Sequence, residues 1–72
     1  MDFKTNAKCQ GCVAAIIEAA RKQFPNARYD LDLDSVEKVL HVHGIPENRE
    51  NAARIEQAIQ ATGFNGSWIQ PE

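Results

Sequence analysis

The order in which hydrophobic periodicity changes along the chain most constrains how it can fold. Residues 1–7, "MDFKTNA", alternate, with Met1, Phe3, Thr5 and Ala7 on one side, which predicts a strand with one buried face. From Cys12 to Phe24, apolar side chains recur every three or four residues, the pattern of an amphipathic helix. Pro25 then ends this helix.

The second half repeats these signals with two strands before the helix. Alternation returns at residues 27–34, "ARYDLDLD", and Asp34 with Ser35 predicts a tight turn. A strand over residues 36–44 follows, in which Leu40 and Val42 should face inward and His41 and His43 outward.

Gly44 and Pro46 break the third strand, and a second amphipathic helix is expected from about Asn48 to Thr62. Gly63 fits the left-handed residue that ends many helices. The last strand is expected within residues 64–72, "FNGSWIQPE", where the pattern does not decide which face Trp68 and Ile69 take.

The order strand, helix, strand, strand, helix, strand has few compact solutions. Right-handed crossovers and one hairpin give an α+β, ferredoxin-like βαββαβ sandwich, with both helices on one face of a four-stranded antiparallel sheet. We expect residues 1–72 to form this single domain. The first strand lies centrally in that topology, so residues 8–12 should emerge beside the 34–35 turn and Phe64.

Composition excludes several classes of function. The net charge of −2, with scattered Lys and Arg, provides no basic stripe for nucleic acid. The longest apolar run, "VAAII", is too short for membrane insertion. Because "MDFKTNAKC" has no secretory apolar stretch, we expect a reducing, cytoplasmic setting.

The two cysteines carry the clearest chemistry. In "KCQGC", Cys9 and Cys12 can bring two thiolates to one soft ion, and a helix start near Cys12 should lower its thiol pKa. We expect Gly11 to let the loop bend and Gln10 to project freely. Zinc prefers four ligands in a structural site, whereas Cu(I) tolerates two, so an exposed pair suits handing the ion on.

The sequence resembles the heavy-metal-associated domains, the βαββαβ modules of copper chaperones and of metal-transporting P-type ATPases. The likeness spans "CQGCVAAI", the "LDLDS…VLHVHG" hairpin and "IEQAIQATGF". It implies that Cys9 and Cys12 are the metal ligands, that Cu(I) is favoured with Zn(II) as an alternative, and that Phe64 lies beside the ion. It also implies a P-type ATPase or another Cys-x-x-Cys protein as partner, and a monomer or a metal-bridged dimer.

Before the first cysteine the family commonly has Gly-Met-Thr, where this chain has Asn6, Ala7 and Lys8. Ala7 in place of a buried methionine predicts a looser or differently packed loop. Lys8 is favoured as a solvated residue, and an electrostatic role beside the ion is its alternative.

Other interpretations use the same residues. A thiol–disulfide oxidoreductase also places Cys-x-x-Cys at a helix start, although the direct hairpin here differs from a thioredoxin-like order. A metal-free interaction module would keep the fold alone. No catalytic constellation is evident, so we expect no enzyme.

Two further patterns allow a metal interpretation. His41 and His43 are favoured as solvated strand residues, with a metal-binding pair as the alternative, and they should lie too far away to complete the cysteine site. Asp30, Asp32 and Asp34 lack the glycine and glutamate of a calcium loop.

Overall fold

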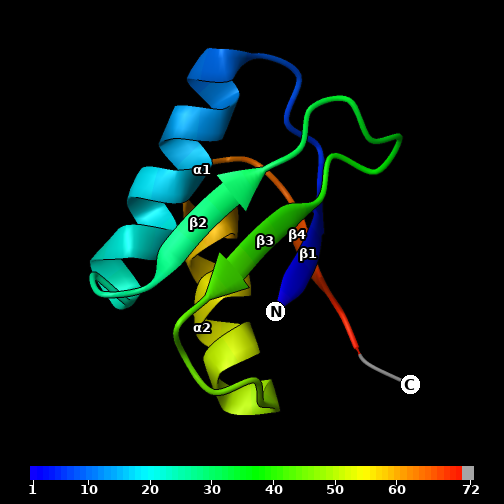
Figure 1. Cartoon of the computed structure of the whole chain (residues 1–72). Coiled ribbons are helices and arrows are strands. Elements are labelled where there is room, and N and C mark those ends of the chain that lie inside the picture. Colours follow the sequence, from blue (N-terminus) through cyan, green and yellow to red (C-terminus); the bar gives the residue numbers. More distant parts are fainter. Residues whose placement is uncertain (71–72) are drawn as a thin grey trace.

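Four short strands and two helices follow one another in the order that the sequence predicts. The computed structural model describes residues 1–70 (Figure 1). Its elements are β1 (Asp2–Thr5), α1 (Gln10–Gln23), β2 (Arg28–Leu31), β3 (Leu40–His43), α2 (Arg49–Ala61) and β4 (Gly66–Ile69). No helix in this described part is both long and apolar enough to cross a membrane.

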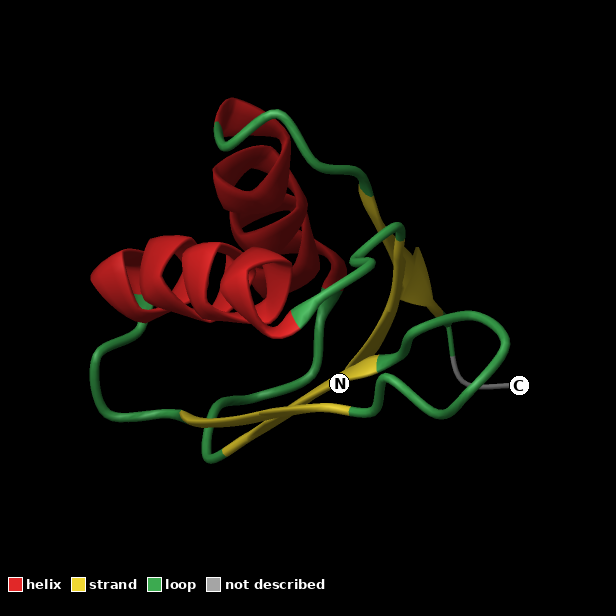
Figure 2. Ribbon diagram, turned by 90° about the horizontal axis from the view of Figure 1, so that it is seen from above, coloured by secondary structure: helices red, strands yellow, loops and turns green. Residues whose placement is uncertain are grey.

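The strands form one antiparallel sheet in the order β2-β3-β1-β4. Phe3 on β1 pairs with Leu40 on one side and with Trp68 on the other, which fixes β1 in the interior of the sheet. The predicted central position of the first strand is therefore confirmed. Both helices pack on the same face of the sheet (Figure 2), so the predicted ferredoxin-like βαββαβ sandwich is confirmed as well.

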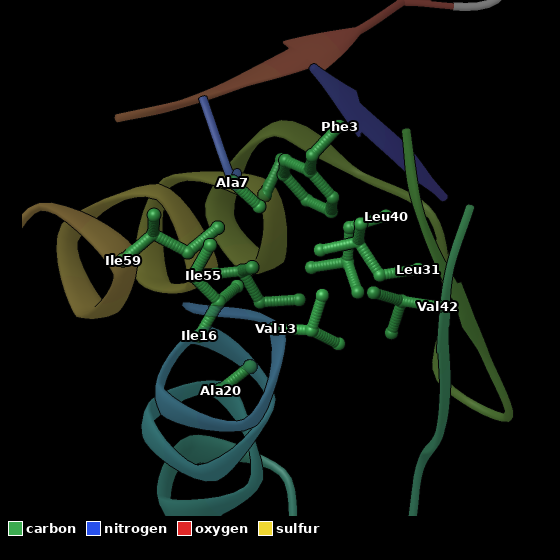
Figure 3. Close-up of a cluster of buried hydrophobic side chains, with 11 residues drawn as sticks. Phe3, Ala7, Val13, Ile16, Ala20, Leu31, Leu40, Val42, Ile55 and Ile59 are labelled. Carbon is green, nitrogen blue, oxygen red and sulfur yellow. The ribbon is translucent and has the colours of Figure 1, made fainter. Parts of the chain in front are cut away.

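The hydrophobic core lies between the sheet and the two helices (Figure 3). Leu40 and Val42 face inward from β3, as predicted, and both are almost completely buried. The helices contribute Ile16, Ile55 and Ile59, which have no exposed surface. Because α1 packs against the core through buried residues such as Ile16, its N-terminal end holds the cysteines in a defined position.

The connection between β2 and β3 corrects one prediction. Instead of a tight turn at residues 34 and 35, a loop spans residues 32–39, and β3 starts at Leu40 instead of Val36. Polar side chains stabilise the wider loop, since Asp32 Oδ1 accepts from the Asp34 amide at 2.9 Å and Ser35 Oγ accepts from the Val39 amide at 3.1 Å. Val36 is left 97% exposed at its tip.

The ends of α2 and β4 fit local signals in the sequence. Asn48 caps α2, and Gly63 takes the predicted left-handed conformation with φ of 93°. β4 begins only at Gly66, where an added Cβ would lie 2.5 Å from Ile59 Cδ1. Glycine thus permits close contact between β4 and α2. The predicted last strand also included residues 71 and 72, which lie outside the described residues.

Candidate metal centre

The loop that leads from β1 to the cysteines is anchored by Ala7. β1 ends at Thr5 instead of continuing to residue 7, yet Ala7 is only 1% exposed. Its methyl group belongs to the core cluster together with Phe3 and Ile59 (Figure 3), and its amide donates to Thr5 Oγ1 at 3.4 Å. The small side chain is therefore packed into the core, which fits the second of the two expectations, a differently packed loop, and not the looser one.

Cys9 forms the N-cap of α1. Its backbone is extended, with φ of −154° and ψ of 172°, and its sulfur accepts a hydrogen bond from the Cys12 amide at 3.4 Å. Because this sulfur satisfies an amide of the first turn, the helix begins at Gln10, two residues earlier than predicted. Gly11 is consequently a helical residue, and its expected role in bending the loop is wrong.

The two sulfur atoms lie 3.0 Å apart. Both cysteines are free, with Cys9 exposed and Cys12 half-buried. The hydrogen bond with the Cys9 thiol is the largest cause that lowers the pKa of the Cys12 thiol, followed by a hydrogen bond to the backbone of Lys8, while partial desolvation opposes them. The pKa is lowered, as predicted, and the hydrogen bond with the neighbouring sulfur is its largest single cause.

Three chain segments meet at this end of the sheet. The β2–β3 loop joins the end of β1, since the Thr5 amide donates to the Glu37 carbonyl at 3.2 Å and Thr5 Oγ1 donates to the Lys38 carbonyl at 2.6 Å. The segment before β4 joins the cysteine loop, since the Asn65 amide donates to Asn6 Oδ1 at 2.8 Å. The end of β1, from which the cysteine loop emerges, thus lies beside both connections, and in Figure 1 the start of α1 and the β2–β3 loop both lie in the upper part of the view.

The other predicted site residues differ in how exposed they are. Lys8 and Gln10 are exposed, as expected for solvated side chains, and Lys8 has no ion-pair partner among residues 1–70. Phe64 lies in the segment joined to the cysteine loop, but its ring is half-buried and packs against the core. Its expected place beside the ion stays a prediction.

The histidines lie elsewhere on the sheet. His41 pairs in register with Asp2, at the start of β1, whereas the cysteines follow the end of that strand. His41 Nδ1 also bonds Asp2 Oδ1 at 2.8 Å, a contact that the sequence analysis missed. Strand alternation places the Asp2 and His41 side chains on the open face of the sheet. Only the pairing register of β1 and β3 brings these two side chains together.

Across residues 1–70, no group of three or more His, Cys, Asp and Glu side chains is arranged to hold a metal ion. Within these residues, the Cys9 and Cys12 pair therefore offers two ligating side chains. Asp32 serves the β2–β3 loop through its bond to the Asp34 amide.

Neither a protein-family model nor a curated protein matches the sequence. Solved structures with a similar fold were found. The copper chaperone Atx1 from Synechocystis PCC6803, in its Cu2 form, superimposes on this chain with a TM-score of 0.72 at 17% sequence identity. The match covers 93% of this chain and 98% of that one. This chain has the Atx1 fold. A trimeric Cu1 form of an Atx1 variant gives a TM-score of 0.75 at 16% identity, with the same coverage of both chains.

The Agrobacterium tumefaciens protein Atu1203 shares the Atx1-like fold. It is 26% identical, with a TM-score of 0.69, and the match covers 90% of this chain and 94% of that one. Another structure with this fold, at 16% identity and a TM-score of 0.71, was described for crosstalk between Cu(I) and Zn(II) homeostasis.

Proposed function

We propose that residues 1–72 form one heavy-metal-associated domain that binds a single soft ion through Cys9 and Cys12 and passes it on. One observation carries the proposal: two free sulfurs lie 3.0 Å apart at the exposed start of a helix. Thiolates select soft ions, and a lowered Cys12 pKa favours the ligating form near neutral pH. Cu(I) is the favoured cargo and Zn(II) the alternative.

Transfer proceeds by exchange of thiolates. A partner thiolate attacks the exposed ion and forms a new metal–sulfur bond before one bond to this chain breaks. A second exchange releases the other sulfur, and each freed thiolate can take up a proton. Metal oxidation state and total charge do not change, so no oxidant or reductant is needed. Two ligands leave room for this step, whereas a closed tetrahedral shell would hinder it.

The partner carries a similar pair of thiols, as a metal-transporting P-type ATPase or another Cys-x-x-Cys protein would. The shared fold with Atx1 supports this choice, and the reduced thiols suit the cytoplasm. The domain acts as a monomer, with a metal-bridged dimer as the alternative, and it carries out no catalysis. Lys8 is the closest basic residue in the sequence for balancing the negative charge of a bis-thiolate ion.

An anaerobic titration tests this function. The reduced protein is titrated with Cu(I), and separately with Zn(II), against a chromophoric chelator, and Cys9→Ser and Cys12→Ser variants are compared. We expect one Cu(I) per chain in competition with the chelator, and loss of competition in either variant. A Gln10→Ala variant is the matched control, because it changes an exposed residue between the cysteines and should bind normally. Binding that survives both cysteine substitutions contradicts the proposal.

The sulfur contact also favours a second candidate, a thiol–disulfide oxidoreductase. Thiols 3.0 Å apart need little movement to form a disulfide, and a lowered Cys12 pKa supplies the attacking thiolate. Equilibration with glutathione distinguishes the two functions. A reversible disulfide poised near cellular reductants, together with weak Cu(I) binding, would favour the oxidoreductase. Failure of both activities in a folded protein would leave a metal-free interaction module.

A further inference from the structure

A second group of ligating side chains occupies the open face of the sheet. His41 and His43 are two residues apart on β3, and their inward neighbours Leu40 and Val42 place both imidazoles on the face opposite the helices. The rings are nearly parallel, with an interplanar angle of 8° and centroids 6.5 Å apart. Two imidazoles thus stand side by side on an open surface.

Asp2 fixes the orientation of one imidazole. Its Oδ1 lies 2.8 Å from His41 Nδ1. Since an ionised carboxylate only accepts hydrogen bonds, it selects the hydrogen on Nδ1, and in the neutral form of the ring Nε2 then keeps its lone pair for a ligand bond. Metal-binding histidines in proteins commonly have such a carboxylate on the second ring nitrogen, where it orients the ring and raises the basicity of the ligand.

The charges that face the pair come from the neighbouring strands. Asp2 on β1 and Asp30 on β2 both pair in register with His41, while Arg28 on β2 pairs with His43. The Arg28 and Asp30 side chains are exposed and point away from the helices. The N-terminal ammonium also lies here, since it donates to the Val42 carbonyl at 2.7 Å, so these four groups together carry no net charge. The two carboxylates lie beside His41 and favour a cation there, whereas Arg28 faces His43.

We propose that His41 and His43 chelate one borderline divalent cation, with Cu(II) as the best probe, and that Asp2 positions His41. Imidazole nitrogens suit Cu(II) and Zn(II), whereas the thiolates at the other end of β1 suit soft Cu(I). With His41 held by Asp2, rotation about the side-chain bonds of His43 brings its free nitrogen toward an ion bound at His41 Nε2. Because no third protein ligand stands ready within residues 1–70, water completes the coordination and the ion exchanges readily.

This site is independent of the proposed cysteine function. His41 pairs with Asp2 at the start of β1, while Cys9 follows the end of that strand, so the two sites lie toward opposite ends of the sheet. Substituting the cysteines should therefore leave the histidine site intact. Such a variant is also required for the test, since thiols bind Cu(II) and reduce it.

The experiment titrates Cu(II) into a Cys9→Ser/Cys12→Ser variant. Electron paramagnetic resonance reports the nitrogen ligands, and the melting temperature reports binding to the folded state. We expect one Cu(II) per chain, hyperfine coupling to two imidazoles and a saturable rise in melting temperature. His41→Asn and His43→Asn should each weaken binding by about tenfold or more, because the chelate is lost. If either variant binds with unchanged affinity, the histidines act independently and the chelate is refuted.

Two charge-matched variants test the role of Asp2. Asp2→Asn and Asp30→Asn each remove one negative charge beside His41, but only Asp2 bonds its ring. Asp2→Asn should weaken Cu(II) binding by about tenfold, more than Asp30→Asn does. Equal losses in the two variants would reduce Asp2 to a general electrostatic contribution and overturn its positioning role. Arg28→Gln should strengthen binding, because it removes the cation facing His43.

Discussion

Cys9 has two roles that use the same atom. Its sulfur caps α1 by accepting a hydrogen bond from the Cys12 amide, and the same sulfur contacts the Cys12 sulfur. An ion bound as proposed would share this sulfur with the amide hydrogen bond of the first helical turn. Serine is among the best N-cap residues and alanine is a poor one, so Cys9→Ser separates ligation from capping, whereas Cys9→Ala removes both.

The sulfur contact predicts the reactivity of Cys12. The pKa of its thiol is lowered, chiefly by the hydrogen bond with Cys9, so thiolate persists to lower pH than in an ordinary cysteine. The rate of alkylation by iodoacetamide, followed in metal-free protein from pH 5 to 10, should therefore reach half its maximum below the pH for a free cysteine peptide. In Cys9→Ala this midpoint should rise toward that of the peptide. An unchanged midpoint would show that the sulfur contact does not set the pKa.

At the scale of elements, close packing between β4 and α2 depends on one glycine. A Cβ on Gly66 would lie 2.5 Å from Ile59 Cδ1 and 3.2 Å from Ile59 Cβ, so rotation of the isoleucine alone cannot make room. The contact holds the segment before β4 near the cysteine loop, because the Asn65 amide bonds Asn6. The position of the cysteine loop thus depends on packing between residues other than the cysteines.

Gly66→Ala should destabilise the fold by about 1–3 kcal/mol, the usual cost of forcing extra volume into a packed core. Urea unfolding followed by circular dichroism measures the change. Ser67→Ala is the matched control, because Ser67 is the exposed next residue on β4 and its substitution should stay within about 0.5 kcal/mol. Equal stability of the Gly66 variant and the wild type would show that α2 and β4 separate freely.

For the whole molecule, the fold holds the cysteines without depending on them. The core consists of residues such as Phe3, Ile16 and Ile59, while Cys9 is exposed and Cys12 half-buried. The metal-free protein should therefore be folded, as the proposed release of an ion to a partner requires.

The Cys9→Ser/Cys12→Ser protein is expected to keep this fold. Its unfolding free energy should lie within about 1 kcal/mol of the metal-free wild type, since serine retains the N-cap, Cys9 is exposed and Cys12 packs only against the edge of the core. Chemical denaturation of both proteins with a metal chelator present makes the comparison. An unfolded double variant would mean that the thiols support the fold.

Periodicity was enough to predict the fold, the central first strand and the inward side chains of β3, because burial on one face imposes a spacing of two or of three to four residues. It failed where side chains bond the backbone locally. Asp32 and Ser35 widen the β2–β3 loop, and the Cys9 sulfur extends α1 backward. The contact between Asp2 and His41 depends on strand register, which alternation alone does not determine.

We infer that two sulfurs at the start of α1 bind one soft ion by themselves. X-ray absorption at the copper edge, on the monomer loaded with one Cu(I) per chain and free of added thiols, tests this inference. We expect a first shell made only of sulfur, with two sulfur neighbours, and its disappearance in Cys9→Ser/Cys12→Ser. A first shell dominated by nitrogen or oxygen, or one that survives the double substitution, would contradict it.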